Sequence, residues 1–157
     1  MRSGAFAPPV SRSSTSATDL GALRREAEAV AKERGERATT THVLYALATR
    51  EGLPAELLAE RRVGRDTLLK ALRVAVDDDT RAEGEPAGFG PIDRLFTRAR
   101  DLAGRARRPN GALDVDGGHV LLAICLDRST AAHKTLAQLG VDVARLRGTL
   151  TQHLTGA

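Results

Sequence analysis

The 157-residue sequence has few aromatic residues, one cysteine and no long apolar run. With three Phe, one Tyr and no Trp, the core must be built mainly from Ala, Leu and Val, which favours closely packed helices. The single cysteine, Cys125, excludes an intramolecular disulfide and a zinc site made of several cysteines. It lies in the apolar run 121–126, where a small buried residue is a better interpretation than a reactive thiol. No stretch approaches the roughly 18 apolar residues of a membrane span.

The first 17 residues lack the continuous apolar segment of a signal peptide, so we expect a cytoplasmic protein. Their Ser, Thr, Pro and small residues predict a disordered N-terminal arm over 1–17. The chain carries 24 basic and 20 acidic residues, for a net charge of +4. This balance indicates a mixed surface rather than a nucleic-acid-binding tail.

A short motif occurs twice in the chain. His42–Leu47 reads HVLYAL, and His119–Ile124 reads HVLLAI. The likeness extends around both copies, because Leu58, Val63, Leu68 and Leu72 correspond in spacing to Leu136, Val141, Leu146 and Leu150. Self-similarity of this kind predicts two copies of one helical unit.

The apolar spacing is helical throughout, and no useful length of sequence alternates with period two, which predicts an all-α fold. We expect two pseudo-symmetric four-helix repeats packed as one eight-helix domain over 18–157. Repeat one spans 18–76, an acidic Gly/Pro-rich linker spans 77–90, and repeat two spans 91–155. The first helix is predicted to start at a cap by Thr18 or Asp19. The predicted caps of the fourth, seventh and eighth helices are Asp66, Ser129 and Asp142.

Three adjacent aspartates, Asp77, Asp78 and Asp79, open the linker. They suggest a metal site, but nothing after them supplies the spacing of a metal-binding loop. A solvated acidic turn is the better interpretation. The four histidines have no ligand-cluster spacing either, so we predict no metal site.

These motifs resemble the double-repeat N-terminal domain of Clp/Hsp100 AAA+ unfoldases, most closely the ClpC type. The family repeat places Gly-Thr-Glu-His before an apolar helix, and the corresponding segments are 40–47 and 117–124. The segment 139–142, Leu-Gly-Val-Asp, resembles the end of the second repeat, and 89–91, Phe-Gly-Pro, resembles the start of the fifth helix. The resemblance covers about residues 18–155.

The resemblance implies a domain that receives adaptors and substrates and, in the ClpC type, binds phosphorylated arginine. In that type a Glu before the repeat histidine contacts the guanidinium, since a carboxylate accepts its paired donors. The corresponding positions here are Thr41, before His42, and Gly118, before His119. The absence of both acids counts against phosphoarginine. For the two histidines, a hydrogen-bonded ring at a helix start is favoured over a ligand contact.

A second surface in some relatives binds cyclic peptide antibiotics. Phe89 matches its aromatic residue and Arg94 keeps the charge of a family Lys. Arg98 stands where a Glu is expected, which reverses the charge, and the aromatic residue near the start of the first helix is absent. Packing between the two halves is the alternative role of Phe89.

No phosphate-binding P-loop and no catalytic constellation occur in the sequence, so we expect no ATPase module, no cofactor and no enzyme activity. The leading interpretation is a binding module for peptides, adaptors or a Clp-type unfoldase. Such a module would modulate Clp-dependent proteolysis or sequester ligands of the full-length unfoldase, cyclic peptide antibiotics included. The alternative is a small basic helical regulator that binds nucleic acid through the arginine-rich segment 105–108.

Overall fold

The computed structural model describes residues 15–74, 78, 90–105 and 115–155. These ranges form eight α-helices and contain no strand, which confirms the all-α prediction. The helices are α1 (Thr15–Glu33), α2 (Thr40–Thr49), α3 (Leu53–Glu60), α4 (Arg65–Leu72), α5 (Pro91–Arg105), α6 (Gly117–Leu126), α7 (Ala131–Gln138) and α8 (Val143–Thr155).

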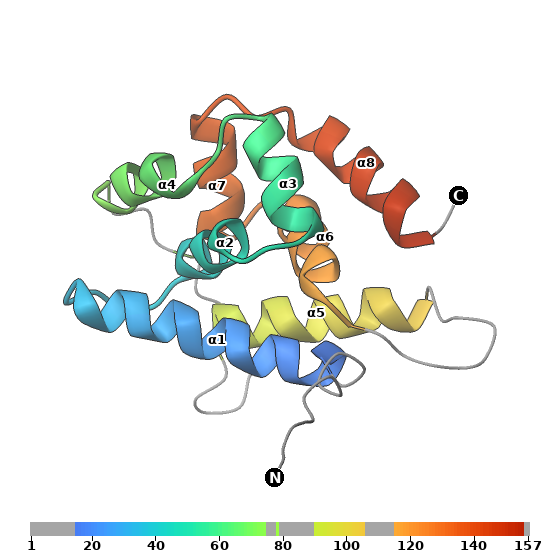
Figure 1. The fold of residues 1–157 in the computed structure, drawn as a ribbon, viewed down its shortest axis with the longest axis horizontal. Helices are drawn as coiled ribbons and strands as arrows, with labels where there is room; N and C mark the ends of the chain where they lie inside the picture. The colour runs from blue at the N-terminus through green and yellow to red at the C-terminus, as the bar shows by residue number, and fades with distance from the viewer. Residues whose placement is uncertain (1–14, 75–77, 79–89, 106–114, 156–157) are drawn as a thin grey trace, which may run out of the picture.

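The two repeats use the same set of contacts. Within them, α1 packs on α2 as α5 packs on α6, and α2 contacts α4 as α6 contacts α8. Between them, α2 packs on α7 while α6 packs on α3. Figure 1 shows α1 and α5 along one side, α2 and α6 in the middle, and the remaining helices opposite. The repeats therefore interlock as one pseudo-symmetric domain, as predicted.

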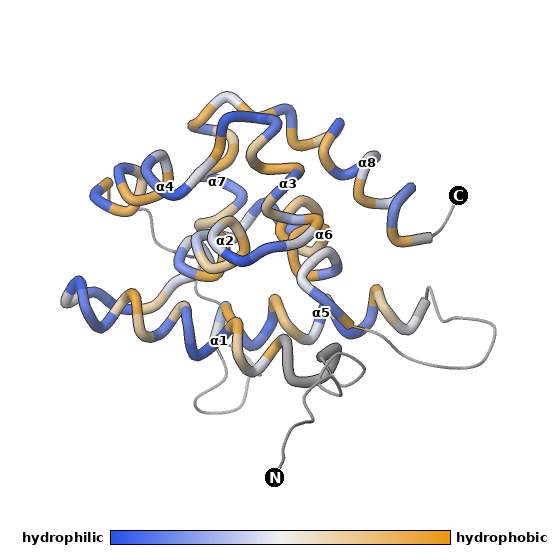
Figure 2. The backbone as a smooth tube through the Cα atoms, viewed as in Figure 1, coloured by the Kyte–Doolittle hydropathy of each residue, from blue (hydrophilic) through white to orange (hydrophobic). Residues whose placement is uncertain are grey.

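Small residues bring the long helices close to the centre of the domain. Leu23, Ala27 and Ala31 on α1 are at most 2% exposed, and so are their counterparts Leu95, Ala99 and Ala103 on α5. Stripes at this spacing lie on one helical face, where alanine lets a neighbouring helix approach. Figure 2 shows the resulting alternation of hydrophilic and hydrophobic segments along α1.

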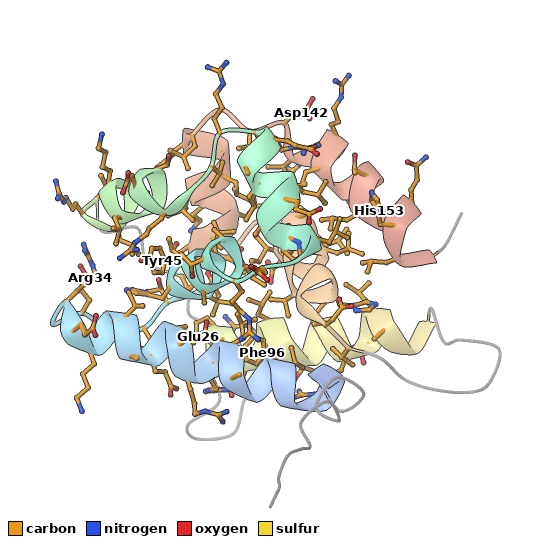
Figure 3. All side chains as sticks on the ribbon, in the orientation of Figure 1. Glu26, Arg34, Tyr45, Phe96, Asp142 and His153 are labelled. Atoms are coloured by element: carbon orange, nitrogen blue, oxygen red, sulfur yellow. The ribbon has the colours of Figure 1, made fainter. Side chains whose placement is uncertain are left out.

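The few aromatic residues that are described lie inside the domain. Tyr45 on α2 is 8% exposed and Phe96 on α5 is 3% exposed. By contrast, Figure 3 shows Asp142 and His153 at the outer surface around α8. A core made mainly from Leu, Ala and Val is thus confirmed for the described residues.

Three predicted helix starts were wrong. The first helix begins at Thr15, earlier than Thr18 or Asp19, and α4 has Gly64 as its N-cap, with Asp66 in the first turn. At α7 the cap is Thr130, whose Oγ1 accepts a hydrogen bond from His133 N at 3.1 Å. Ser129 lies one residue before this cap, and its hydroxyl donates to Asp127 Oδ1 at 2.5 Å.

The cap by Asp142 is confirmed, because its Oδ1 accepts from Arg145 N at 3.1 Å. Gly35 and Gly140 end their helices with φ of 70° and 84°, a conformation that favours glycine. Most of the predicted arm, residues 1–14, and most of the linker, residues 77 and 79–89, lie outside the described residues, as do 75–76 at the end of repeat one.

One ion pair ties the long helices of the two repeats. Arg24 Nη1 on α1 lies 2.7 Å from Asp93 Oδ1 on α5. The other carboxylate oxygen of Asp93 accepts from Gly90 N at 2.8 Å, which caps the start of α5. The hydrogen bond from Arg24 lowers the pKa of Asp93, although partial burial acts in the opposite direction.

Candidate binding site

The histidine of each motif copy caps its own helix. His42 Nδ1 accepts a hydrogen bond from Thr39 N at 2.9 Å, and His119 Nδ1 accepts from Asp116 N at 3.2 Å. The rings are buried, with residue exposures of 3% and 6%. Each ring thus satisfies a backbone N–H at the start of a helix, the role that the sequence favoured.

In the first copy the second ring nitrogen is engaged as well. His42 Nε2 lies 3.0 Å from Glu36 Oε1, and Glu36 also accepts from Arg34 Nε at 2.9 Å. Since Nδ1 accepts from the backbone, the neutral ring carries its proton on Nε2 and donates it to Glu36. The bond from Arg34, followed by that from His42, lowers the pKa of Glu36. Neither nitrogen of His42 is left for a ligand.

In the second copy the cap is reinforced by a carboxylate. Asp116 Oδ1 accepts from Gly118 N at 2.8 Å and lies 3.3 Å from His119 Nδ1. Burial acts to raise the pKa of Asp116, but the proximity of His119 and the bond from Gly118 N lower it overall. The negative charge is therefore held beside the N-terminus of α6, where a helix favours it.

The two positions that hold the family Glu face the interior. Thr41 is 3% exposed, and its Oγ1 lies 3.2 Å from Oγ1 of Thr135 on α7. Gly118 is buried, and a Cβ there would lie 3.0 Å from Leu154 Cδ2 and 3.1 Å from Asp116 Oδ1. An acid at position 118 would therefore meet both an apolar side chain and an existing carboxylate.

A pocket of about 170 Å³ opens where the two repeats meet, between the start of α3 and the start of α6. Its charged residues are Arg50, Glu51 and Asp116; Leu47, Gly52, Leu53, Pro54, Gly117 and Gly118 complete the wall. Arg50 Nη1 is held 3.2 Å from Glu26 Oε2 on α1. The starts of two helices, one arginine and two carboxylates thus line this pocket, so it presents both donors and acceptors.

The corresponding place in the first half lies between α2 and α7, and Asp78 fills it. Its Oδ2 accepts from Thr40 N at 3.0 Å, and its Oδ1 accepts from Thr40 Oγ1 at 2.5 Å and from Ala131 N at 2.6 Å. The interpretation of this aspartate as part of a solvated turn was wrong. The only signal in the sequence was an acidic residue with no hydrogen-bond donor close to it along the chain. Its donors lie 38 and 53 positions away, so no local pattern could identify them.

The predicted antibiotic surface lies at the other end of α6. Arg94 is half-buried and Arg98 is exposed, both on α5. Asp127 follows α6, and although burial acts to raise its pKa, two bonds from Ser129 and the nearby charges of Arg98 and Arg94 lower it. Helix α6 has ten residues and is about 15 Å long, and Gly118 lies at its opposite end. Phe89 lies outside the described residues.

The described residues contain no group of three or more His, Cys, Asp or Glu side chains able to hold a metal ion. Cys125 is buried, and burial raises the pKa of its thiol to about 12. Within the same ranges, none of the helices has the length and apolar character needed to cross a bilayer.

The described helices define a double-repeat all-helical domain. The sequence matches the Clp repeat (R) N-terminal domain over residues 22–139, which is more than half of the chain. The chain belongs to this family. The matched range includes both copies of the histidine motif and the walls of the pocket. A search of curated proteins found no match.

Clp N-terminal domains are generally modules that bind substrates or adaptors, and they are themselves non-catalytic. Membership suggests protein partners from the Clp system. The 157 residues contain no P-loop, so this sequence holds no nucleotide-binding site of that type.

Proposed function

We propose that this chain is a non-enzymatic module that binds peptides or proteins of the Clp system through the pocket between α3 and α6. Its partners would be a Clp-type unfoldase, an adaptor or a substrate, and we expect it to act in the cytoplasm. By occupying such partners it would modulate Clp-dependent proteolysis. The observation that carries the proposal is the convergence of two helix N-termini and Arg50 on one open pocket at the joint of the repeats.

The charge distribution of the pocket supports a peptide as ligand. Arg50 and the first turns of α3 and α6 offer positive charge and N–H donors, while Glu51 and Asp116 offer acceptors. Leu47, Leu53 and Pro54 supply an apolar floor. A peptide segment carries all three kinds of group, and concave sites with a few fixed polar groups are typical of specific binding.

The same geometry argues against phosphoarginine as the ligand. Thr41 and Gly118 replace the family acids and are buried, and Thr41 is paired with Thr135. Beside Gly118, the carboxylate of Asp116 accepts from Gly118 N through Oδ1. In our proposal His42, His119, Thr41 and Gly118 shape the site without contacting the guanidinium of a ligand.

A cyclic peptide antibiotic remains a candidate ligand for the separate surface that contains Arg94 and Arg98. Sequestering such a compound away from the full-length unfoldase would be a second consequence of the same binding capacity. Titration calorimetry with the antibiotic tests this, using Arg98→Glu, which restores the family charge, as the comparison variant. If both proteins give the same heat of binding, Arg98 is not part of the surface that binds the antibiotic.

The proposed function is tested by affinity capture with the immobilised chain and a variant that blocks the pocket. Glu51→Trp places a large ring at the rim, where Glu51 is exposed. Glu60→Trp, at the exposed end of α3, adds the same ring away from the pocket. We expect a Clp unfoldase, adaptor or substrate to be recovered with the wild type and Glu60→Trp but not with Glu51→Trp.

Recovery of no Clp component by any of the three proteins would contradict the function. Equal recovery by all three would contradict the pocket as its site. Binding to generic duplex DNA that weakens steeply with salt would instead favour the nucleic-acid alternative, because phosphate contacts release counterions. Most of the segment 105–108 on which that alternative rests lies outside the described residues.

A further inference from the structure

The carboxylate of Asp78 is bound by the first residues of two helices, α2 and α7, and Asp78 belongs to neither helix. Thr40 N and Thr40 Oγ1, in the first turn of α2, both donate to it, and Ala131 N, the first residue of α7, donates to Oδ1. Thr40 Oγ1 in turn accepts from Ala132 N at 3.0 Å. First-turn N–H groups have no partner within their own helix, so the arrangement is a cradle for an oxyanion.

In the second half of the domain, the corresponding place is an open pocket in the part of the chain that the structure describes. In the repeat, Gly117 on α6 corresponds to Thr40, and Leu53 on α3 corresponds to Ala131. Both Gly117 and Leu53 line the open pocket. Since the two halves share one architecture, the first half shows which chemistry fits between two such helix starts, and that chemistry is a carboxylate.

We propose that Asp78 is an internal competitor: its carboxylate fills an oxyanion-binding site between α2 and α7, and so closes the first half of the domain to external ligands. A carboxylate or phosphate group of a ligand would use the same three donors once Asp78 no longer occupies them. The domain therefore has one closed and one open half, although its repeats are equivalent in fold. The proposal concerns the first half and does not require that the pocket of the second half bind a ligand.

The competing explanation is that Asp78 is only a structural staple. A staple predicts that its removal lowers the midpoint of urea unfolding and creates no binding site. A competitor predicts that removal exposes donors at Thr40 and Ala131 that bind an added oxyanion. The two explanations therefore differ in a binding measurement and not only in stability.

The test is a titration of the ¹⁵N-labelled full chain with inorganic phosphate at constant ionic strength, followed by NMR. Asp78→Ala removes the occupant. Asp66→Ala removes an exposed carboxylate of the same half and gives the same net charge. We expect saturable shifts of the Thr40 and Ala131 amides in Asp78→Ala, with an affinity about tenfold or more above that of the wild type and of Asp66→Ala, the worth of one charge-assisted hydrogen bond.

Shifts of the same size in all three proteins would overturn the proposal, because they would report charge alone. A folded Asp78→Ala protein without saturable shifts would overturn it too. If Asp78→Ala does not fold, Asp78→Asn keeps the shape but not the charge, and an affinity no higher than that of the wild type would count against the proposal.

A parallel titration with acetate distinguishes a carboxylate ligand from a phosphate ligand. The amides of Leu53 and Gly117 report the second half in the same spectra. If they stay unchanged while Thr40 and Ala131 respond, the pocket between α3 and α6 fails as an oxyanion site and the inference about Asp78 stands.

Discussion

Gly118 lies directly against Leu154, so that a Cβ on Gly118 would stand 3.0 Å from Leu154 Cδ2. This contact joins the start of α6 to the last turn of α8. Because position 118 is where the ClpC-type relatives are expected to carry an acid, the contact links the packing of α8 to the loss of that acid. A side chain at position 118 would therefore meet Leu154 at the wall of the pocket.

Gly118→Glu is expected to lower the free energy of unfolding by about 1–3 kcal/mol, as overpacking of a filled site does. The new carboxylate would also stand beside Asp116. Gly148→Glu on α8 is the control, since a Cβ there meets open space, and its effect should stay within about 1 kcal/mol. Urea unfolding measures both. Equal stability of the two variants would show that Leu154 moves aside freely.

The two capping histidines, His42 and His119, are expected to contribute differently to the free energy of unfolding. His42→Ala loses bonds at both ring nitrogens, whereas His119→Ala loses the contacts of Nδ1 with Asp116. Each loss of a cap should cost about 0.5–2 kcal/mol, with the larger value at His42. His153→Ala, at an exposed position, should stay within about 0.5 kcal/mol. A larger effect at His119 than at His42 would contradict this assignment.

The stability that the Arg24–Asp93 pair provides should depend on pH. The pKa of Asp93 is lowered in the folded state, chiefly by the hydrogen bond from Arg24, so the contribution is present above the unfolded pKa and is lost as pH falls through the folded pKa. Asp93→Asn should therefore be less stable than the wild type at pH 7, by at most about 1 kcal/mol because Arg24 is partly exposed. The difference should shrink below about pH 4.

Thermal unfolding of the wild type, Asp93→Asn, Arg24→Ala and the double variant at several pH values isolates this pair. A difference between wild type and Asp93→Asn that grows on acidification would contradict the sign given above. Added salt should reduce the difference at pH 7, because screening weakens partly exposed pairs.

Cys125 should be inert towards thiol reagents in the folded protein. Its residue exposure is 4% and burial raises the pKa of the thiol to about 12, so almost no thiolate is present at pH 8. Alkylation with iodoacetamide, followed by mass spectrometry, should modify the chain only in denaturant. Modification of the native protein at the rate of a small free thiol would show that the core around α6 opens readily.

The helical framework could be predicted from the sequence because its signals are local. The spacing of Leu23, Ala27 and Ala31, repeated by Leu95, Ala99 and Ala103, defines a buried face whatever packs on it, and all six proved buried. The caps were less predictable. Ser129 and Thr130 are both good caps by residue type, and only the structure shows that the hydroxyl of Thr130 accepts the bond from His133 N.

The candidate site could be predicted only in part. The sequence pointed to the residues before and at each histidine, and the structure shows that they are buried caps and packing positions. Their role in ligand binding stays a prediction, as does that of Arg94 and Arg98. Phe89 lies outside the described residues.

By itself the sequence determined that this protein is an all-helical duplication of the Clp repeat, because periodicity, turns and the repeated motif act over short distances. Only the tertiary structure decided that the two halves differ between their helix starts, where Asp78 lies in the first half and a pocket opens in the second. Asp78 meets donors far away in the sequence, and Gly118 meets Leu154 at the end of the chain's last helix. Contacts of this kind follow from how α2 packs on α7 and α6 packs on α3 and α8, and no local pattern encodes them.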